Sequence, residues 1–203
     1  SDETLDDLVD VGDGYAYGFE IFLEKRLGRI NGWASYSWSI ARKKFQNKEY
    51  YTNWDRRHVF NIIGNFRLNP KWDINGKWTF QTGQPYTQIL GYYIEKVPDA
   101  STQIFRTIPG ARNGGRYPLY HRLDLGAVYH TKFKGKSMDV FIQIVNTYWQ
   151  KNVFRYAYRF GSTINGTDDD GDKEIDEDDE GRPQRGAING LPIIPSIGVT
   201  FEF

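Results

Sequence analysis

The last eight residues of the chain, 196–203, alternate between apolar and polar positions. The first set is Ile197, Val199, Phe201 and Phe203, and the second is Gly198, Thr200 and Glu202. Successive side chains of a β-strand point to opposite faces. The pattern therefore predicts a strand with one apolar and one polar face, ending at the carboxy-terminal aromatic Phe203, as membrane-inserted β-barrels end.

The same period of two recurs in six earlier segments: 15–26, 30–41, 59–68, 72–84, 122–133 and 138–149. In the fourth predicted strand, Trp72, Ile74 and Trp78 alternate with polar residues, and in the fifth Arg122 and Asp124 share the polar face. The polar set of 72–84 includes Asp73, Lys77 and Gln81. A transmembrane β-strand needs about 9–11 residues, so each segment is long enough to cross a bilayer.

The connections between these segments alternate between short and long. The short ones are 27–29, 69–71 and 134–137, and the long ones are about 42–58, 85–121 and 150–195. Bacterial outer-membrane barrels have short periplasmic turns and long outer loops. The sequence therefore predicts an all-β, antiparallel, up-and-down transmembrane barrel with a periplasmic carboxy terminus, and assigns residues 1–203 to barrel alone, without a plug domain.

A soluble antiparallel sandwich with one wet face alternates in the same way. The aromatic content favours the membrane, because 14 Tyr, 13 Phe and 6 Trp crowd toward strand ends, as interfacial girdles do. No apolar run approaches the roughly 20 residues of a spanning helix.

Seven strands are an odd number, whereas single-chain bacterial barrels normally have an even number. An unpaired edge in hydrocarbon costs several kcal/mol for each unsatisfied backbone group. We therefore expect either a further strand within 87–94 or 152–160, or strands supplied by residues outside this sequence.

Charge and residue usage argue against two classes of function, nucleic acid binding and catalysis. Ten of the 26 acidic residues but only one of the 26 basic residues lie in 168–180, so the rest of the chain is moderately basic. It carries no concentrated basic stripe of the kind that nucleic acid binding needs. Cysteine is absent and the three histidines are scattered, and no Ser, His and acid spacing suggests catalysis. We predict neither a nucleic acid partner nor an enzyme.

The acidic run resembles a twelve-residue EF-hand calcium loop that begins at Asp168. Its predicted ligands are Asp168, Asp170, Asp172, Glu174 through its carbonyl, Asp176 and Asp179. Lys173 stands where that loop needs Gly, and Asp179 is shorter than the usual Glu. The alternatives are Ca²⁺ binding and a solvated, unliganded acidic loop.

Five motifs together resemble the closing region of TonB-dependent outer-membrane receptors. They are Asp55-Arg56-Arg57-His58, the run from Gln81 to Thr87, Tyr120 to Leu125, Val145 to Trp149, and Ile193 to Ser196. The resemblance implies the last seven or so strands of a 22-stranded barrel around a plug, and import of a ligand with energy from the TonB complex.

The resemblance also implies partners: outer-membrane lipid, the rest of the barrel and its plug, TonB through that plug, and a surface lipoprotein or other protein. On this interpretation Arg122, Asp124, Asp73, Lys77 and Gln81 face the lumen and plug. Arg122 and Asp124, two apart on one strand, have three candidate partners, namely each other, a neighbouring strand and the plug, and a structural ion pair is favoured over a substrate contact.

Two other functions remain open. One is a non-transporting structural or adhesive barrel subunit with a calcium-binding surface loop, and the other is a soluble calcium-binding sandwich. Aromatic residues of the long connections, such as Tyr51, Trp54 and Tyr92, are candidates for ligand stacking or for the interfacial girdle.

Overall fold

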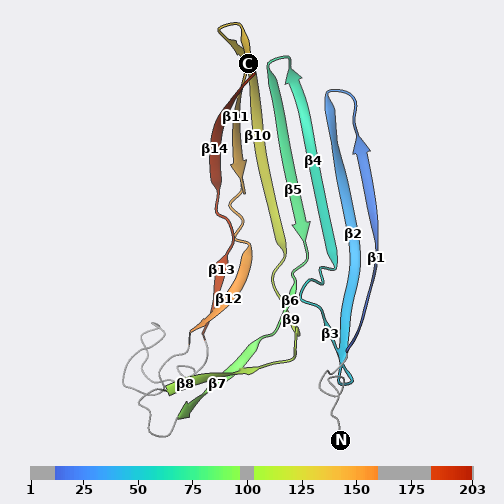
Figure 1. Cartoon of the computed structure of the whole chain (residues 1–203), viewed down its shortest axis with the longest axis vertical. Helices are drawn as coiled ribbons and strands as arrows, with labels where there is room; N and C mark the ends of the chain where they lie inside the picture. The colour runs from blue at the N-terminus through green and yellow to red at the C-terminus, as the bar shows by residue number, and fades with distance from the viewer. Residues whose placement is uncertain (1–11, 97–102, 160–183, 203) are drawn as a thin grey trace, which may run out of the picture.

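The computed structural model describes residues 12–96, 103–159 and 184–202, and every regular element in them is a β-strand (Figure 1). A single antiparallel sheet dominates, with the strand order β1-β2-β4-β5-β10-β11-β14. These strands are β1 (Asp13–Lys25), β2 (Ile30–Phe45), β4 (His58–Asn69), β5 (Trp72–Gln81), β10 (Tyr120–Phe133), β11 (Lys136–Val145) and β14 (Ile194–Phe201). The all-β, up-and-down arrangement is thus confirmed. Among the described residues, no helix has the length and apolarity that crossing a membrane requires.

The three short turns lie together at one end of the sheet, and the long connections lie at the other (Figure 1). Two of these turns use left-handed backbone, with φ of 100° at Gly28 and of 51° and 81° at Lys134 and Gly135. Glycine adopts such angles without steric cost, which makes tight hairpins possible. We call the two ends of the sheet the turn end and the loop end.

The long connections contain short strands of their own. These are β3 (Lys48–Tyr51), which pairs with β2, and the pairs β6 (Pro85–Tyr86) with β9 (Gly115–Arg116), β7 (Ile89–Lys96) with β8 (Gln103–Pro109), and β12 (Val153–Arg159) with β13 (Gln184–Asn189). Strands β7 and β12 fall where a missed strand was expected. Each belongs to a separate two-stranded sheet, so neither adds an eighth strand to the main path.

Two predicted strands end earlier than the alternation suggested. Strand β11 stops at Val145 instead of 149, because Asn146 and Trp149 adopt φ of 56° and 54°, which leave the extended conformation. Strand β5 stops at Gln81 instead of 84. Beyond it, Gly83 passes so close to the backbone of Tyr117 that the chain leaves the ladder.

The register places apolar residues in line across the sheet. One row joins six strands through directly paired residues: Ile30, Phe66, Ile74, Ala127, Ile142 and Ile197. The adjacent row, on the other face, consists of Asn31, Asn65, Asn75, Gly126, Gln143 and Ser196. We call these two surfaces the apolar face and the polar face.

Burial is inverted relative to a protein that folds around an apolar core. Within the described residues, the buried hydrophobic set contains Ala41 alone, whereas Asp55, Asp124 and Asn146 are among seven buried polar residues. On the apolar face, Ile142 is 48% and Ile197 is 72% exposed. The sheet therefore has no hydrophobic core of its own.

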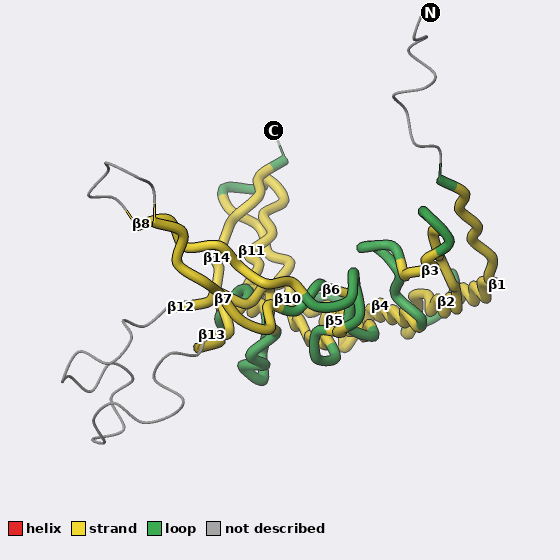
Figure 2. Tube along the Cα trace, turned by 90° about the horizontal axis from the view of Figure 1, so that it is seen from below, coloured by secondary structure: helices red, strands yellow, loops and turns green. Residues whose placement is uncertain are grey.

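The sheet is open in the described part of the chain, with β1 at one edge and β14 at the other (Figure 2). The two edge strands do not pair with each other, so the structure shows a large up-and-down sheet and no closed barrel within those residues.

The close approach at Gly83 is testable by adding one carbon. In Gly83→Ala, the new Cβ would overlap the carbonyl group of Tyr117, so backbone must shift, at a cost of about 1–3 kcal/mol. We expect a lower thermal unfolding midpoint, measured by circular dichroism in detergent. Gly64→Ala is the control, because nothing lies within 4 Å of its added Cβ. Equal midpoints for the two variants would contradict this packing.

Candidate binding site on the polar face

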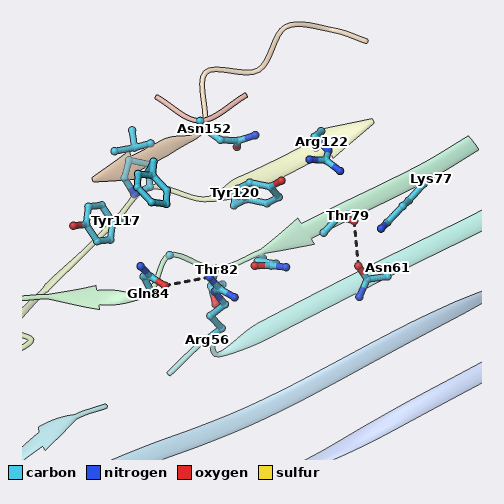
Figure 3. Close-up of a pocket in the computed structure, with 16 residues that line it drawn as sticks. Arg56, Asn61, Lys77, Thr79, Thr82, Gln84, Tyr117, Tyr120, Arg122 and Asn152 are labelled. Carbon is cyan, nitrogen blue, oxygen red and sulfur yellow. Dashed lines mark hydrogen bonds between the residues drawn. The ribbon is translucent and has the colours of Figure 1, made fainter. Parts of the chain in front are cut away.

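A depression of about 530 Å³ lies on the polar face near the loop end (Figure 3). Its wall comes from β4, β5, β10, β12 and the connections that follow β5 and precede β10. The residues that matter chemically are Arg56, Lys77, Gln81, Gln84, Tyr120 and Arg122. This volume falls within the range of about 300–1,000 Å³ of small-molecule sites.

The five polar residues that were predicted to face the lumen and plug all lie on the polar face, but they do not all lie at the same place on it. In the register Lys77 pairs with Asp124 and Gln81 pairs with Tyr120. Lys77, Gln81 and Arg122 line the depression. Asp73 lies at the turn end instead, where its carboxylate is 3.2 Å from Nε2 of His130.

Arg122 and Asp124 form the expected ion pair. Nε and Nη2 of Arg122 donate to Oδ2 of Asp124 at 3.1 and 2.8 Å. The other carboxylate oxygen, Oδ1, accepts the backbone N–H of Asn146 at 2.9 Å. Since Asp124 is only 6% exposed, its charge is committed to holding this part of the wall together.

Two asparagines, one directly after β11 and one directly before β12, extend this network, and their roles were not predicted. Asn146 is fully buried, and its Nδ2 donates to the carbonyls of Gln150 and Leu191 at 3.0 Å each. Asn152 accepts the N–H of His121 at 3.0 Å and donates to its carbonyl at 2.9 Å. These side chains bond to backbone groups beyond the end of the β10–β11 ladder. For Asn146, the available signal in the sequence was an Asn directly after a strand, because Asn tolerates φ > 0.

Asp55 is the second buried carboxylate and ties two of the long connections to each other and to β2. It is 1% exposed and accepts the backbone N–H of Ala41 at 2.8 Å. Arg116 donates to its other oxygen, and the same guanidinium reaches the carbonyl of Gly83 at 3.0 Å. Arg57 lies 3.7 Å away. Of the two arginines that follow Asp55, Arg57 thus serves this cluster, whereas Arg56 lines the depression.

Tyr51 lies beside this cluster among three arginines. The guanidinium groups of Arg42, Arg57 and Arg116 lie 4.5, 5.4 and 4.7 Å from its ring centroid. Hydrogen bonds from Arg57 and Arg42 lower the pKa of its phenol below the usual value. Since protein side chains already occupy its surroundings, Tyr51 is a structural residue and not an open stacking surface.

Three tyrosines from two of the long connections pack together next to the depression. The ring centroids of Tyr86, Tyr117 and Tyr156 lie 4.5 to 5.2 Å apart. The guanidinium of Arg185 lies 4.3 Å from the centroid of Tyr156, and burial raises the pKa of Tyr117. This cluster docks the β12–β13 hairpin against the segment that contains β6.

The predicted calcium ligands from Asp168 to Asp179, and the terminal Phe203, lie outside the described residues. Within the residues that are described, no group of three or more His, Asp or Glu side chains is arranged to hold a metal ion. Comparison with known protein families, with curated proteins and with solved structures finds no match to this chain.

The Asp55 cluster yields a stability prediction. Asp55→Ala removes the acceptor of the Ala41 N–H and leaves Arg116 without its carboxylate. Breaking a buried ion pair from one side costs about 3–5 kcal/mol, so we expect a large fall in the thermal unfolding midpoint. Glu49→Ala, which removes the exposed partner of Arg42, should leave the midpoint unchanged within error. Similar midpoints for the two variants would show that Asp55 does not hold the connections together.

Proposed function

We propose that this chain forms an arc of the wall of a bacterial outer-membrane β-barrel, in a receptor of the TonB-dependent class that imports a ligand. The observation that carries the proposal is the continuous apolar face across the strands of the main sheet, opposed by a continuous polar face. The motifs from Asp55 to Ser196 that resemble this class support the finer assignment.

The apolar face needs a non-aqueous neighbour. Soluble monomers rarely expose contiguous apolar patches larger than a few hundred Å², yet this surface extends across six directly paired residues in its central row. Aromatic residues lie on the same face toward the loop end, including Tyr15, Tyr17 and Trp38, with Trp72 at the turn end. Such residues are typical of membrane interfaces. Lipid is the neighbour that fits both features.

The two open edges support a barrel that is larger than this arc. In a bilayer, the unpaired backbone groups of β1 and β14 would each cost several kcal/mol. Further strands that pair with both edges would remove this cost and close the wall. The polar face then lines a lumen that is filled by water and by the plug domain of this class.

In the proposed import cycle, the described residues provide a wall and part of the outer vestibule. A ligand binds at the loop end, the TonB complex pulls on the plug, and the polar face of β5 and β10 lines the opened path. A structural or adhesive barrel subunit without transport is the alternative outcome of the second test below.

Charge placement on neighbouring residues distinguishes a membrane wall from a soluble sheet. Ile142 lies on the apolar face and Gln143 on the polar face of β11. Ile142→Arg should destabilise a barrel by about 2–4 kcal/mol, because lipid solvates charge poorly, whereas Gln143→Arg should have little effect. The readout is the urea midpoint of the full protein refolded in lipid vesicles. A greater loss for Gln143→Arg would contradict the membrane wall.

The native polypeptide tests the receptor class directly. We expect the protein extracted by detergent from outer membranes to have an intact mass several times 23.6 kDa, because plug and upstream strands belong to it. We also expect it to retain the purified periplasmic domain of the host TonB protein on an affinity column. An outer-membrane protein of small mass that does not retain TonB would be the non-transporting barrel instead.

A further inference from the structure

The depression on the polar face carries more positive charge than its wall neutralises. Three cationic side chains line it, from Arg56, Lys77 and Arg122, and no carboxylate does so among the described residues (Figure 3). The charge of Arg122 is balanced by Asp124 at 2.8 Å. The net charge of the depression therefore depends on whether Lys77 and Arg56 have acidic partners.

Lys77 lies opposite Asp124 in the register, but that carboxylate is already used. One oxygen accepts both bonds from Arg122, and the other accepts the N–H of Asn146. The described part of the chain gives Lys77 no hydrogen bond or ion pair, and its side chain is exposed toward the depression.

Arg56 is also without an acidic partner in the described ranges. Its Nη2 donates to the neutral Oε1 of Gln84 at 3.1 Å. This bond orients the guanidinium beside the depression without neutralising it (Figure 3). Two cations without an acidic partner in the described ranges thus line one depression, Arg56 near its loop-end margin and Lys77 farther along β5 (Figure 3). Charge-assisted hydrogen bonds to an anion are about twice as strong as neutral ones.

The rest of the wall is suited to hydroxyl groups. The amide of Gln81 and the phenol of Tyr120 supply both donors and acceptors. Phe154, which is 68% exposed, adds an apolar surface at the margin. Thr79 and Asn61 bond to each other at 3.1 Å and so form a satisfied floor.

We propose that this depression binds an anionic, hydroxyl-rich ligand of the class of acidic oligosaccharides, with one carboxylate at Lys77 and another at Arg56. The inference rests on the proposed function, because it assigns a substrate class to the same receptor. The ring hydroxyls then bond to Gln81 and Tyr120, and Arg122 remains paired with Asp124 as the fixed part of the wall.

The test compares two probes that differ at C6 of each sugar, which is a carboxylate in one and a neutral hydroxymethyl group in the other. Galacturonic acid trimer and galactose trimer are titrated calorimetrically into the full-length protein, purified in detergent from outer membranes. We expect saturable binding of the acidic trimer and at least tenfold weaker binding of the neutral one. Equal affinities, or binding of neither probe, would overturn the proposal.

Variants connect the binding to these side chains. Lys77→Gln and Arg56→Gln should each weaken binding of the acidic trimer by at least tenfold, and Lys77→Arg should restore most of it. Lys132→Gln is the matched control, because this lysine lies on the polar face at the turn end. An unchanged affinity in Lys77→Gln and Arg56→Gln would place the anion elsewhere and refute the assignment.

Together with the TonB and mass measurements, the titrations distinguish failure of the substrate class from failure of the proposed function. If the protein retains TonB but binds no acidic trimer, the receptor proposal stands and the substrate class is wrong. If it neither retains TonB nor has the mass of a larger receptor, the proposed function itself fails.

Discussion

The hydrogen-bonded ladder from β1 to β14 is the constraint on which the rest of the structure depends. Each inner strand pairs with a neighbour on both sides, which satisfies its backbone N–H and C=O groups. The pairing also fixes the parity of every side chain, since a slip of one residue moves a whole strand to the opposite face. The rows that contain Ile142 and Gln143 are adjacent in the same register, and this register alone sends one row to the apolar face and the other to the polar face.

Beyond the ends of the ladder, polar side chains provide the hydrogen-bond partners of backbone groups. Asp55 accepts a backbone N–H from β2, Asp124 accepts one from the end of β11, and Asn152 bonds to both backbone groups of His121. These groups are buried although the apolar face is exposed, because they lie on the polar face or among the connections. They tie the connections to the strands, and they explain how a sheet without an apolar core keeps a defined loop end.

The alternation of side chains was sufficient to predict the seven long strands, their order along the chain and the pairing of Arg122 with Asp124, because each depends on residues close in sequence. Strand ends were predicted less well. Asn146 interrupts β11 through a left-handed backbone, and Gly83 ends β5 through an approach to Tyr117, which no local pattern shows. The cluster around Asp55 joins it to Ala41 and Arg116, 14 and 61 residues away. Contacts over such distances are fixed by the tertiary arrangement and have no local periodicity.

The alternation of faces also separates two demands on the same strand. In β5, Trp78 faces the apolar side while Lys77 and Thr79 face the polar side, so no side chain serves both faces. The charge of Lys77 is tolerable because its side chain is exposed. A change at Lys77 therefore alters the electrostatics of the depression while leaving the ladder and the apolar face intact. By this argument the charge of the depression can change by single substitutions on the polar parity, whereas a charged substitution on the apolar parity breaks the continuous apolar row.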